Sequence, residues 1–195
     1  MHDPFAGTGE RLGEVCDSLL LPFTGTEIEA PFIIDPRVKH GNSRLASSYP
    51  EGRYCICTSP VYPNGMTDHF HARDSSRRKT YRQARASISG EDQPLHLDNM
   101  GRHGPRQGKL GEERHWAIAW DATEWWPSRV LVNIKDCILD REVYPAVEMW
   151  LDILVRRGYQ CTCHEVLAPG MRFGANGDSR VDYEVVIEAY WRVTV

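Results

Sequence analysis

Two short segments hold the residues that could do chemistry. The first, residues 3–9, reads Asp-Pro-Phe-Ala-Gly-Thr-Gly. It is a glycine loop suited to closing over a nucleotide-like ligand, because glycine lets the backbone turn tightly and approach a ligand closely. The second, residues 59–62, reads Ser-Pro-Val-Tyr and places a hydroxyl side chain, a proline carbonyl and an aromatic ring beside one another. We expect the two segments to work together.

In this order, the two segments resemble the cofactor loop and the catalytic tetrapeptide of S-adenosylmethionine-dependent methyltransferases that modify exocyclic amino groups of nucleic-acid bases. The residues after the tetrapeptide and a late Gly-Ala-Asn-Gly at 174–177 resemble short methyltransferase-like proteins of phages and actinobacteria. The resemblance implies an α/β, Rossmann-like class I methyltransferase sheet of seven strands with helices on both faces. It also implies S-adenosylmethionine as cofactor and DNA as partner, with RNA not excluded.

The proposed chemistry follows from the weak nucleophilicity of exocyclic amino groups, whose lone pair is delocalised into the ring. Acceptors for the amino protons make that lone pair available, and Ser59 Oγ and the Pro60 carbonyl would supply them. Tyr62 would stack on a base turned out of the duplex. Serine at the first position favours cytosine N4 over adenine N6 in this family. Methylation at cytosine C5 needs a cysteine that typically follows proline, and the chain has no Pro-Cys pair.

The resemblance assigns the cofactor to the first loop and to two later positions. Glu27 fits the acid, about 20 residues after a nucleotide-binding loop, that holds ribose hydroxyls; Glu29 is the alternative. Asn42 is the candidate beside the adenine amino group. The loop residues expected at the cofactor are Asp3 (to its ammonium group), Phe5 (to its methionine part), Pro4, Ala6, Gly7, Thr8 and Gly9.

Two features depart from the family pattern. Val61 stands where the family usually has proline, which loosens the loop without removing either acceptor. Only Met1 and His2 precede Asp3, so the first strand is very short or the native chain begins further upstream. The alternatives are an RNA methyltransferase, a non-catalytic cofactor- or nucleic-acid-binding homologue, and a small-molecule N-methyltransferase.

Positive charge is concentrated after the tetrapeptide. The net charge is −4, yet residues 59–115 hold ten lysines and arginines against seven acidic residues. A phosphate backbone would dock on such a segment, although a basic run is also typical of a solvated surface. The expected phosphate contacts are Arg73, Arg77, Arg78, Lys79 and Arg82. Asp68, His69 and His71 could be metal ligands, but methyl transfer needs no metal and we expect none.

The remaining pattern predicts the elements that position these segments. Helical spacing predicts helices over residues 10–19, 116–126 and 143–157, the last one stopped by Gly158. Apolar and β-branched runs predict a strand ending near residue 27 and strands over 53–58, 129–134, 159–166 and 181–195. Residues 69–115 are polar, basic and aperiodic, which predicts a substrate-recognition insertion outside the core. Alternating helices and strands favour one domain, residues 1–195, with a mostly parallel sheet.

The cysteines and the hydropathy of the chain indicate the cellular compartment. The six cysteines include two Cys-x-Cys pairs, which do not match the usual zinc spacing, so we expect buried, reduced thiols. No run approaches the roughly 20 apolar residues of a membrane helix, and the N-terminus does not resemble a signal peptide. These features predict a cytoplasmic protein without membrane contact; a homo-oligomer is compatible with them.

Overall fold

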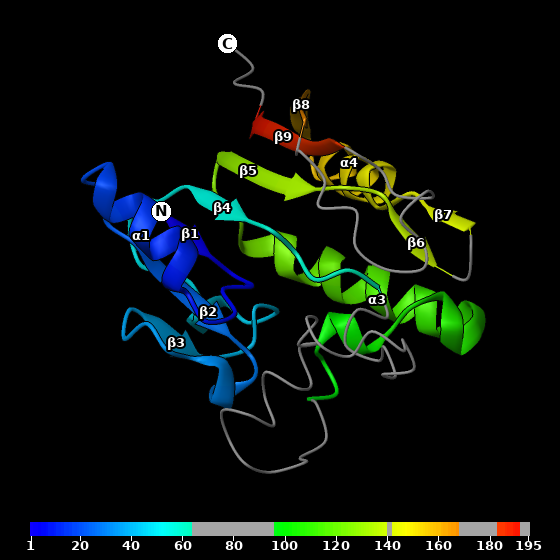
Figure 1. Cartoon of the computed structure of the whole chain (residues 1–195), viewed down its shortest axis with the longest axis horizontal. Helices are drawn as coiled ribbons and strands as arrows, with labels where there is room; N and C mark the ends of the chain where they lie inside the picture. Colours follow the sequence, from blue (N-terminus) through cyan, green and yellow to red (C-terminus); the bar gives the residue numbers. More distant parts are fainter. Residues whose placement is uncertain (64–95, 140–141, 168–182, 192–195) are drawn as a thin grey trace.

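A computed structural model describes residues 1–63, 96–139, 142–167 and 183–191, and the following account concerns these residues (Figure 1). They contain a seven-stranded sheet in the order β3-β2-β1-β4-β5-β9-β8. The strands are β1 (His2–Asp3), β2 (Thr24–Glu27), β3 (Val38–His40), β4 (Ile56–Thr58), β5 (Arg129–Ile134), β8 (Tyr159–Leu167) and β9 (Tyr183–Trp191). The first five are parallel, and β9 runs antiparallel to both β5 and β8. The expected α/β class with a seven-stranded, mostly parallel sheet is confirmed, and this sheet is consistent with a Rossmann-like fold.

The first strand, β1, has two residues and lies at the centre of the sheet. His2 pairs with Thr24 of β2 and with Ile56 of β4. Its imidazole is buried against the rings of Tyr49 and Tyr54, with centroids 5.3 and 5.9 Å away. A strand this short is held by neighbours on both sides.

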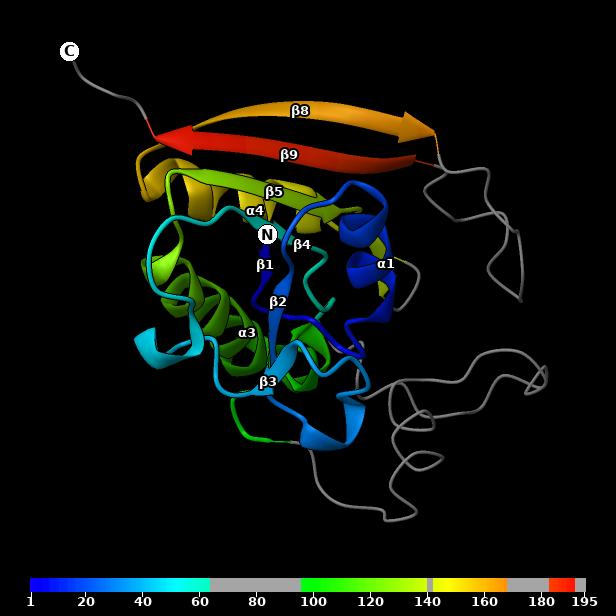
Figure 2. The same ribbon diagram turned by 90° about the vertical axis from the view of Figure 1, so that its left-hand side faces the viewer.

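Helices cover both faces of the sheet (Figure 2). Helix α3 (Gly108–Ala122) and helix α4 (Ala146–Arg156) pack on one face, where the main core buries Ile56, Val132 and Ile187 with the stacked rings of Trp126 and Trp150. Helix α1 (Glu10–Ser18) covers the other face with a smaller cluster of Cys16, Phe23 and Val38. Separate apolar clusters on the two faces are typical of a helix–sheet–helix arrangement.

The sequence placed the start of α3 too late and treated part of the core as an insertion. The helix begins at Gly108, eight residues before the expected start at 116, and η5 (Thr123–Trp125) follows it. Two short 3-10 turns, η3 (Met100–Arg102) and η4 (Pro105–Gln107), lead into it. Met100 is 2% exposed and His115 fully buried. Residues 96–115 therefore belong to the packed domain. The sequence pattern did not reveal this, because α3 buries glycine, alanine and histidine as well as apolar side chains and so shows little periodicity.

The start of α4 is also later than expected. The predicted helix over 143–157 includes Val143, but this residue lies in β7 (Glu142–Tyr144) and is 59% exposed. β7 pairs with β6 (Cys137–Leu139). Pro145 is the N-cap of α4. A residue before proline is biased towards extended backbone, so Tyr144 ends the strand and the helix starts after the proline. The strand over 53–58 is likewise shorter than predicted, because only Ile56–Thr58 pair in the sheet.

The cysteines are free thiols, as predicted, but most are not buried. Only Cys16 is buried, while Cys163 is exposed on β8. β8 is an edge strand, and from Thr162 to Leu167 it is exposed on both faces, so the expectation of buried thiols is wrong there. Among the described helices, none has the length and hydropathy needed to cross a lipid bilayer.

The N-terminus of α1 provides a test of the glycine loop. Gly7 and Gly9 both have positive φ, +55° and +76°. A Cβ at position 9 would lie 2.3 Å from Cγ2 of Val38 and 3.0 Å from Cβ of Asp35, whereas nothing lies within 4 Å of one at position 7. We expect Gly7→Ala to lower the free energy of unfolding by about 1–2 kcal/mol through backbone strain. Gly9→Ala should cost on the order of 1–3 kcal/mol more, through overpacking.

Urea denaturation of the two variants measures this difference, with Gly7→Ala as the matched control for backbone strain. Equal losses for the two variants would show that the contact with Val38 does not fix the loop.

Candidate functional site

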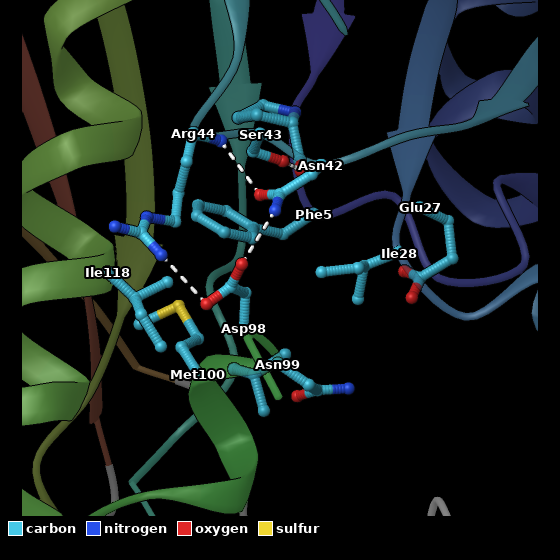
Figure 3. A pocket seen from close by; sticks show the side chains of 12 residues that line it. Phe5, Glu27, Ile28, Asn42, Ser43, Arg44, Asp98, Asn99, Met100 and Ile118 are labelled. Carbon is cyan, nitrogen blue, oxygen red and sulfur yellow. Dashed lines mark hydrogen bonds and ion pairs between the residues drawn. The ribbon is translucent and has the colours of Figure 1, made fainter. Parts of the chain in front are cut away.

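A pocket opens at the carboxyl ends of the parallel strands. It is a hollow of about 380 Å³, a volume that includes space open to solvent. Its lining comes from the segments that follow β1, β2, β3 and β4 and from residues 98–100 and α3 (Figure 3). Chain order runs from β1 outwards through β2 and β3, and then returns to β4 on the other side of β1. Ligands bind at such a switch point in open α/β sheets.

Several residues predicted from the sequence meet in this pocket. Those in its lining are Pro4, Phe5, Glu27 and Asn42. From the tetrapeptide only Val61 lines it, and the predicted catalytic residues Ser59, Pro60 and Tyr62 do not. The other predicted loop residues, all within the described part of the chain, do not line it: Asp3, Ala6, Gly7, Thr8 and Gly9. Pro4 and Phe5 of the loop therefore line the pocket, and the glycines that follow connect the loop to α1.

Glu27 is buried at the end of β2 and ties the loop to the sheet. Its Oε2 accepts a hydrogen bond from the Gly7 amide at 2.9 Å, and its Oε1 accepts one from the Glu29 amide at 2.9 Å. A carboxylate offers about four acceptor positions. Of the two acids considered from the sequence, Glu27 lines the pocket and Glu29 does not.

Asp3 lies at the junction of β1 and β4. Its Oδ1 accepts hydrogen bonds from the Thr58 hydroxyl at 2.6 Å and from the Phe5 amide at 3.0 Å. Burial raises the pKa of Asp3 to about 6, although these two hydrogen bonds act in the opposite direction. The contact fixes the end of β4 immediately before Ser59.

The tetrapeptide leaves β4 with its members in different environments. Ser59 is exposed, Pro60 is buried, and Tyr62 is half-buried against the main core. The Tyr62 hydroxyl accepts a hydrogen bond from the Lys135 amide at 3.3 Å, just beyond β5. Burial raises the pKa of the Tyr62 phenol to about 12 and that of the neighbouring Cys57 thiol to about 11. Neither group is a base or a nucleophile near neutral pH.

The segment after β3 is fixed at one wall of the pocket. The Ser43 hydroxyl donates to the Pro4 carbonyl, which joins this segment to the first loop. Arg44 forms ion pairs with Asp98, at 2.7 Å, and with Asp121 of α3, at 2.6 Å. Asn42 donates from Nδ2 to Asp98 Oδ2 at 2.9 Å. Asn42 lines the pocket, but its amide nitrogen already donates to a carboxylate.

Sequence reasoning missed the residues that close the pocket after the tetrapeptide: Asp98, Asn99, Met100 and Ile118. Asp98, Asn99 and Met100 fall in the stretch read as an insertion, and Ile118 falls in the helix predicted over 116–126. Buried Glu29 anchors the first of these segments, because its Oε1 accepts from the His96 amide at 2.7 Å and from Asn99 Nδ2 at 3.0 Å. One local signal was available: Asn99 caps η3 by accepting from the Gly101 amide at 3.0 Å. Asparagine is a preferred cap.

Part of the predicted site lies outside the described residues. This applies to the five expected phosphate contacts, Arg73, Arg77, Arg78, Lys79 and Arg82, to the possible metal ligands Asp68, His69 and His71, and to residues 174–177. Among the described residues, no group of histidine, cysteine and acidic side chains could hold a metal ion.

Comparison with known proteins gives no identification: no family model matches the chain, and no curated protein sequence matches it significantly.

The buried Asp3 carboxyl predicts a pH dependence of stability. Its pKa is raised in the folded state, so between about pH 4 and 6 the folded protein holds a proton that the unfolded chain has lost. Stability associated with this group is therefore present at low pH and falls as the pH rises through 6. Asp3→Asn carries no charge, and we expect it to gain on the order of 2 kcal/mol relative to wild type between pH 4 and pH 7.5.

Urea denaturation across this pH range measures the change. Asp152→Asn, at a more exposed acid on α4, is the control and should show a smaller change. A difference between wild type and Asp3→Asn that stays constant with pH would contradict a buried, protonated Asp3.

Proposed function

We propose that this chain is an S-adenosylmethionine-dependent methyltransferase that modifies an exocyclic amino group of a DNA base. One observation carries the proposal: the predicted cofactor residues Phe5, Glu27 and Asn42 line a single pocket at the switch point of the sheet, together with Val61, which is next to the proposed catalytic Pro60 and Tyr62 in sequence. These positions are spread over almost sixty residues of sequence, and they meet where a nucleotide-like ligand would bind.

The chemistry of the pocket lining supports a ligand of this kind. Glu27 and Asp98 supply carboxylate acceptors at separate points of the lining, and Phe5, Ile28, Met100 and Ile118 supply apolar surface (Figure 3). A nucleoside has hydroxyl and amino donors on a flat ring system that buries well against such side chains. Glu27 would hold the ribose hydroxyls. Asp3 would reach the ammonium group from the junction of β1 and β4, with its charge favoured by that cation despite burial.

The catalytic side of the proposal rests on Ser59, Pro60 and Tyr62. S-adenosylmethionine would supply the methyl group, which passes to the base nitrogen as its bond to sulfur breaks and leaves a neutral thioether. Ser59 Oγ and the Pro60 carbonyl would accept the amino protons of the base, so that the nitrogen lone pair points at the methyl carbon. The extra proton on nitrogen would leave to water. Much of the rate would come from alignment, which the Asp3–Thr58 contact supports.

Base choice and nucleic-acid contact extend this proposal. Cytosine N4 remains the favoured target because of Ser59, with adenine N6 second and RNA as the alternative substrate. The tetrapeptide is accessible at Ser59 and partly accessible at Tyr62, as a base turned out of a duplex requires. The basic residues proposed to contact phosphate follow it in sequence.

Incubation with S-adenosylmethionine and unmethylated DNA, followed by nucleoside mass spectrometry, tests the reaction. We expect new N4-methylcytosine, or N6-methyladenine if adenine is the target. Combined Ser59→Ala and Tyr62→Ala should lower the yield by roughly 100-fold or more, because acceptor and stacking surface are both lost. Binding of S-adenosylmethionine should change little.

The control for this variant combines Ser47→Ala and Tyr190→Ala, which change exposed side chains outside the pocket lining. Product on RNA alone would move the assignment to RNA. Cofactor binding without product on any nucleic acid would favour the non-catalytic homologue, and full activity of the Ser59/Tyr62 variant would remove these residues from catalysis.

Calorimetry tests the cofactor site independently of turnover. We expect Glu27→Gln to weaken S-adenosylmethionine binding by roughly 10-fold or more, because a ribose contact is lost and an amide group meets the Gly7 amide as a second donor. Glu14→Gln, at an exposed acid on α1, is the matched control. Equal affinities in both variants would place the ribose elsewhere.

A further inference from the structure

The side-chain amide of Asn42 is engaged by the protein at both its oxygen and its nitrogen. Its Oδ1 accepts from the Arg44 amide at 3.1 Å, and its Nδ2 donates to Asp98 Oδ2 at 2.9 Å. Figure 3 shows both contacts, with Asn42 between Arg44 and Asp98. An amide engaged in this way positions its neighbour. Asp98 also lines the pocket, and its charged carboxylate is a stronger acceptor than the Asn42 amide oxygen.

Asp98 is held in place from several elements. Its Oδ1 lies 2.7 Å from Arg44 Nη1 and 3.7 Å from Arg114 Nη2 of α3. Arg44 is itself fixed by two contacts to Asp121 of α3, at 2.6 and 2.9 Å. The backbone on the amino-terminal side of Asp98 is anchored where Glu29 binds the His96 amide. A side chain so constrained can recognise a ligand geometrically, because little freedom is lost on binding.

The chemistry of Asp98 selects one kind of ligand group. A carboxylate between two guanidinium groups is an acceptor, and the two hydrogen bonds from Arg44 Nη1 and Asn42 Nδ2 leave about two of its four acceptor positions unused. Its side chain is 20% exposed and lines the pocket. The apolar side chains of Ile28, Met100 and Ile118 share that lining. A carboxylate acceptor beside apolar side chains favours a flat apolar ring with an N–H donor at its edge.

We propose that Asp98 is the residue through which this pocket selects a 6-aminopurine, by accepting a hydrogen bond from the exocyclic amino group, and that Asn42 and Arg44 position its carboxylate. The inference rests on the proposed function, in which the ring is the adenine of the cofactor. It assigns the adenine contact, expected at Asn42, to a residue that follows the tetrapeptide. A 6-oxopurine presents an acceptor at the same edge and would face the carboxylate unfavourably.

Calorimetry with two ligands tests the inference. S-adenosylhomocysteine carries the amino group, and S-inosylhomocysteine has a carbonyl oxygen in its place. We expect wild type to prefer the adenosyl ligand by roughly 10- to 100-fold, because a site built for a hydrogen bond rejects the ligand that lacks it. Asp98→Asn can turn an amide N–H towards the carbonyl, so the preference should shrink to a few-fold or reverse. Asn42→Ala should reduce it in part.

Asp152→Asn is the matched control, because it removes the charge of a partly exposed acid on α4 that lies outside the pocket lining; its ligand preference should equal that of wild type. Thermal unfolding of each variant confirms that it is folded. A wild-type protein that binds both ligands equally, or an Asp98→Asn variant with the wild-type preference, would overturn the inference and leave the proposed function standing. Binding of neither ligand to wild type would overturn both.

Discussion

The hydrogen bond from the Thr58 hydroxyl to the Asp3 carboxylate joins the two strands at the centre of the sheet, and the site is built around this junction. β1 has only two residues, too few to fix its own position, so it depends on β2 and β4 on either side. The glycine loop leaves the end of β1 and the tetrapeptide leaves the end of β4. A contact at 2.6 Å between those two ends sets the distance between the proposed cofactor loop and the proposed catalytic residues. A buried carboxyl with a raised pKa is the cost of this arrangement.

A second polar network closes the pocket on the side of β3. Glu29, Asn42, Arg44 and Asp121 bring residues 96–99 against the segment that follows β3. Since β3 has three residues, side-chain contacts provide much of the order that a longer strand would give. Such a network fixes geometry only when its members are satisfied, and the described contacts pair each carboxylate in it with an amide or a guanidinium group. The same groups would then serve recognition of a ligand without further rearrangement.

The main core explains how a small domain can carry so many polar contacts at one edge. Trp126 and Trp150 stack at 5.6 Å beneath the sheet, and Phe5 meets Trp150 edge to face at 6.4 Å. Phe5 therefore has two roles, since it also lines the pocket. Its contact with the core would transmit the rigidity of α4 to the proposed cofactor site. The uncovered length of β8 is at the opposite edge of the sheet from β3, away from this arrangement.

The sequence by itself determined the α/β class, the mostly parallel sheet, α1 and β5, because these follow from local periodicity and glycine placement. It also indicated Glu27 and Asn42 at strand ends, since the carboxyl ends of parallel strands meet at one edge. Only the tertiary structure decided that Asp98 and Met100 line the pocket and that Asn42 donates a hydrogen bond to Asp98. That hydrogen bond joins residues more than fifty positions apart. Asp98 and Met100 also precede α3, a helix whose pattern is too weakly amphipathic to indicate where it begins. Pairings between distant polar side chains leave no period in the sequence, so they become visible only when the chain is folded.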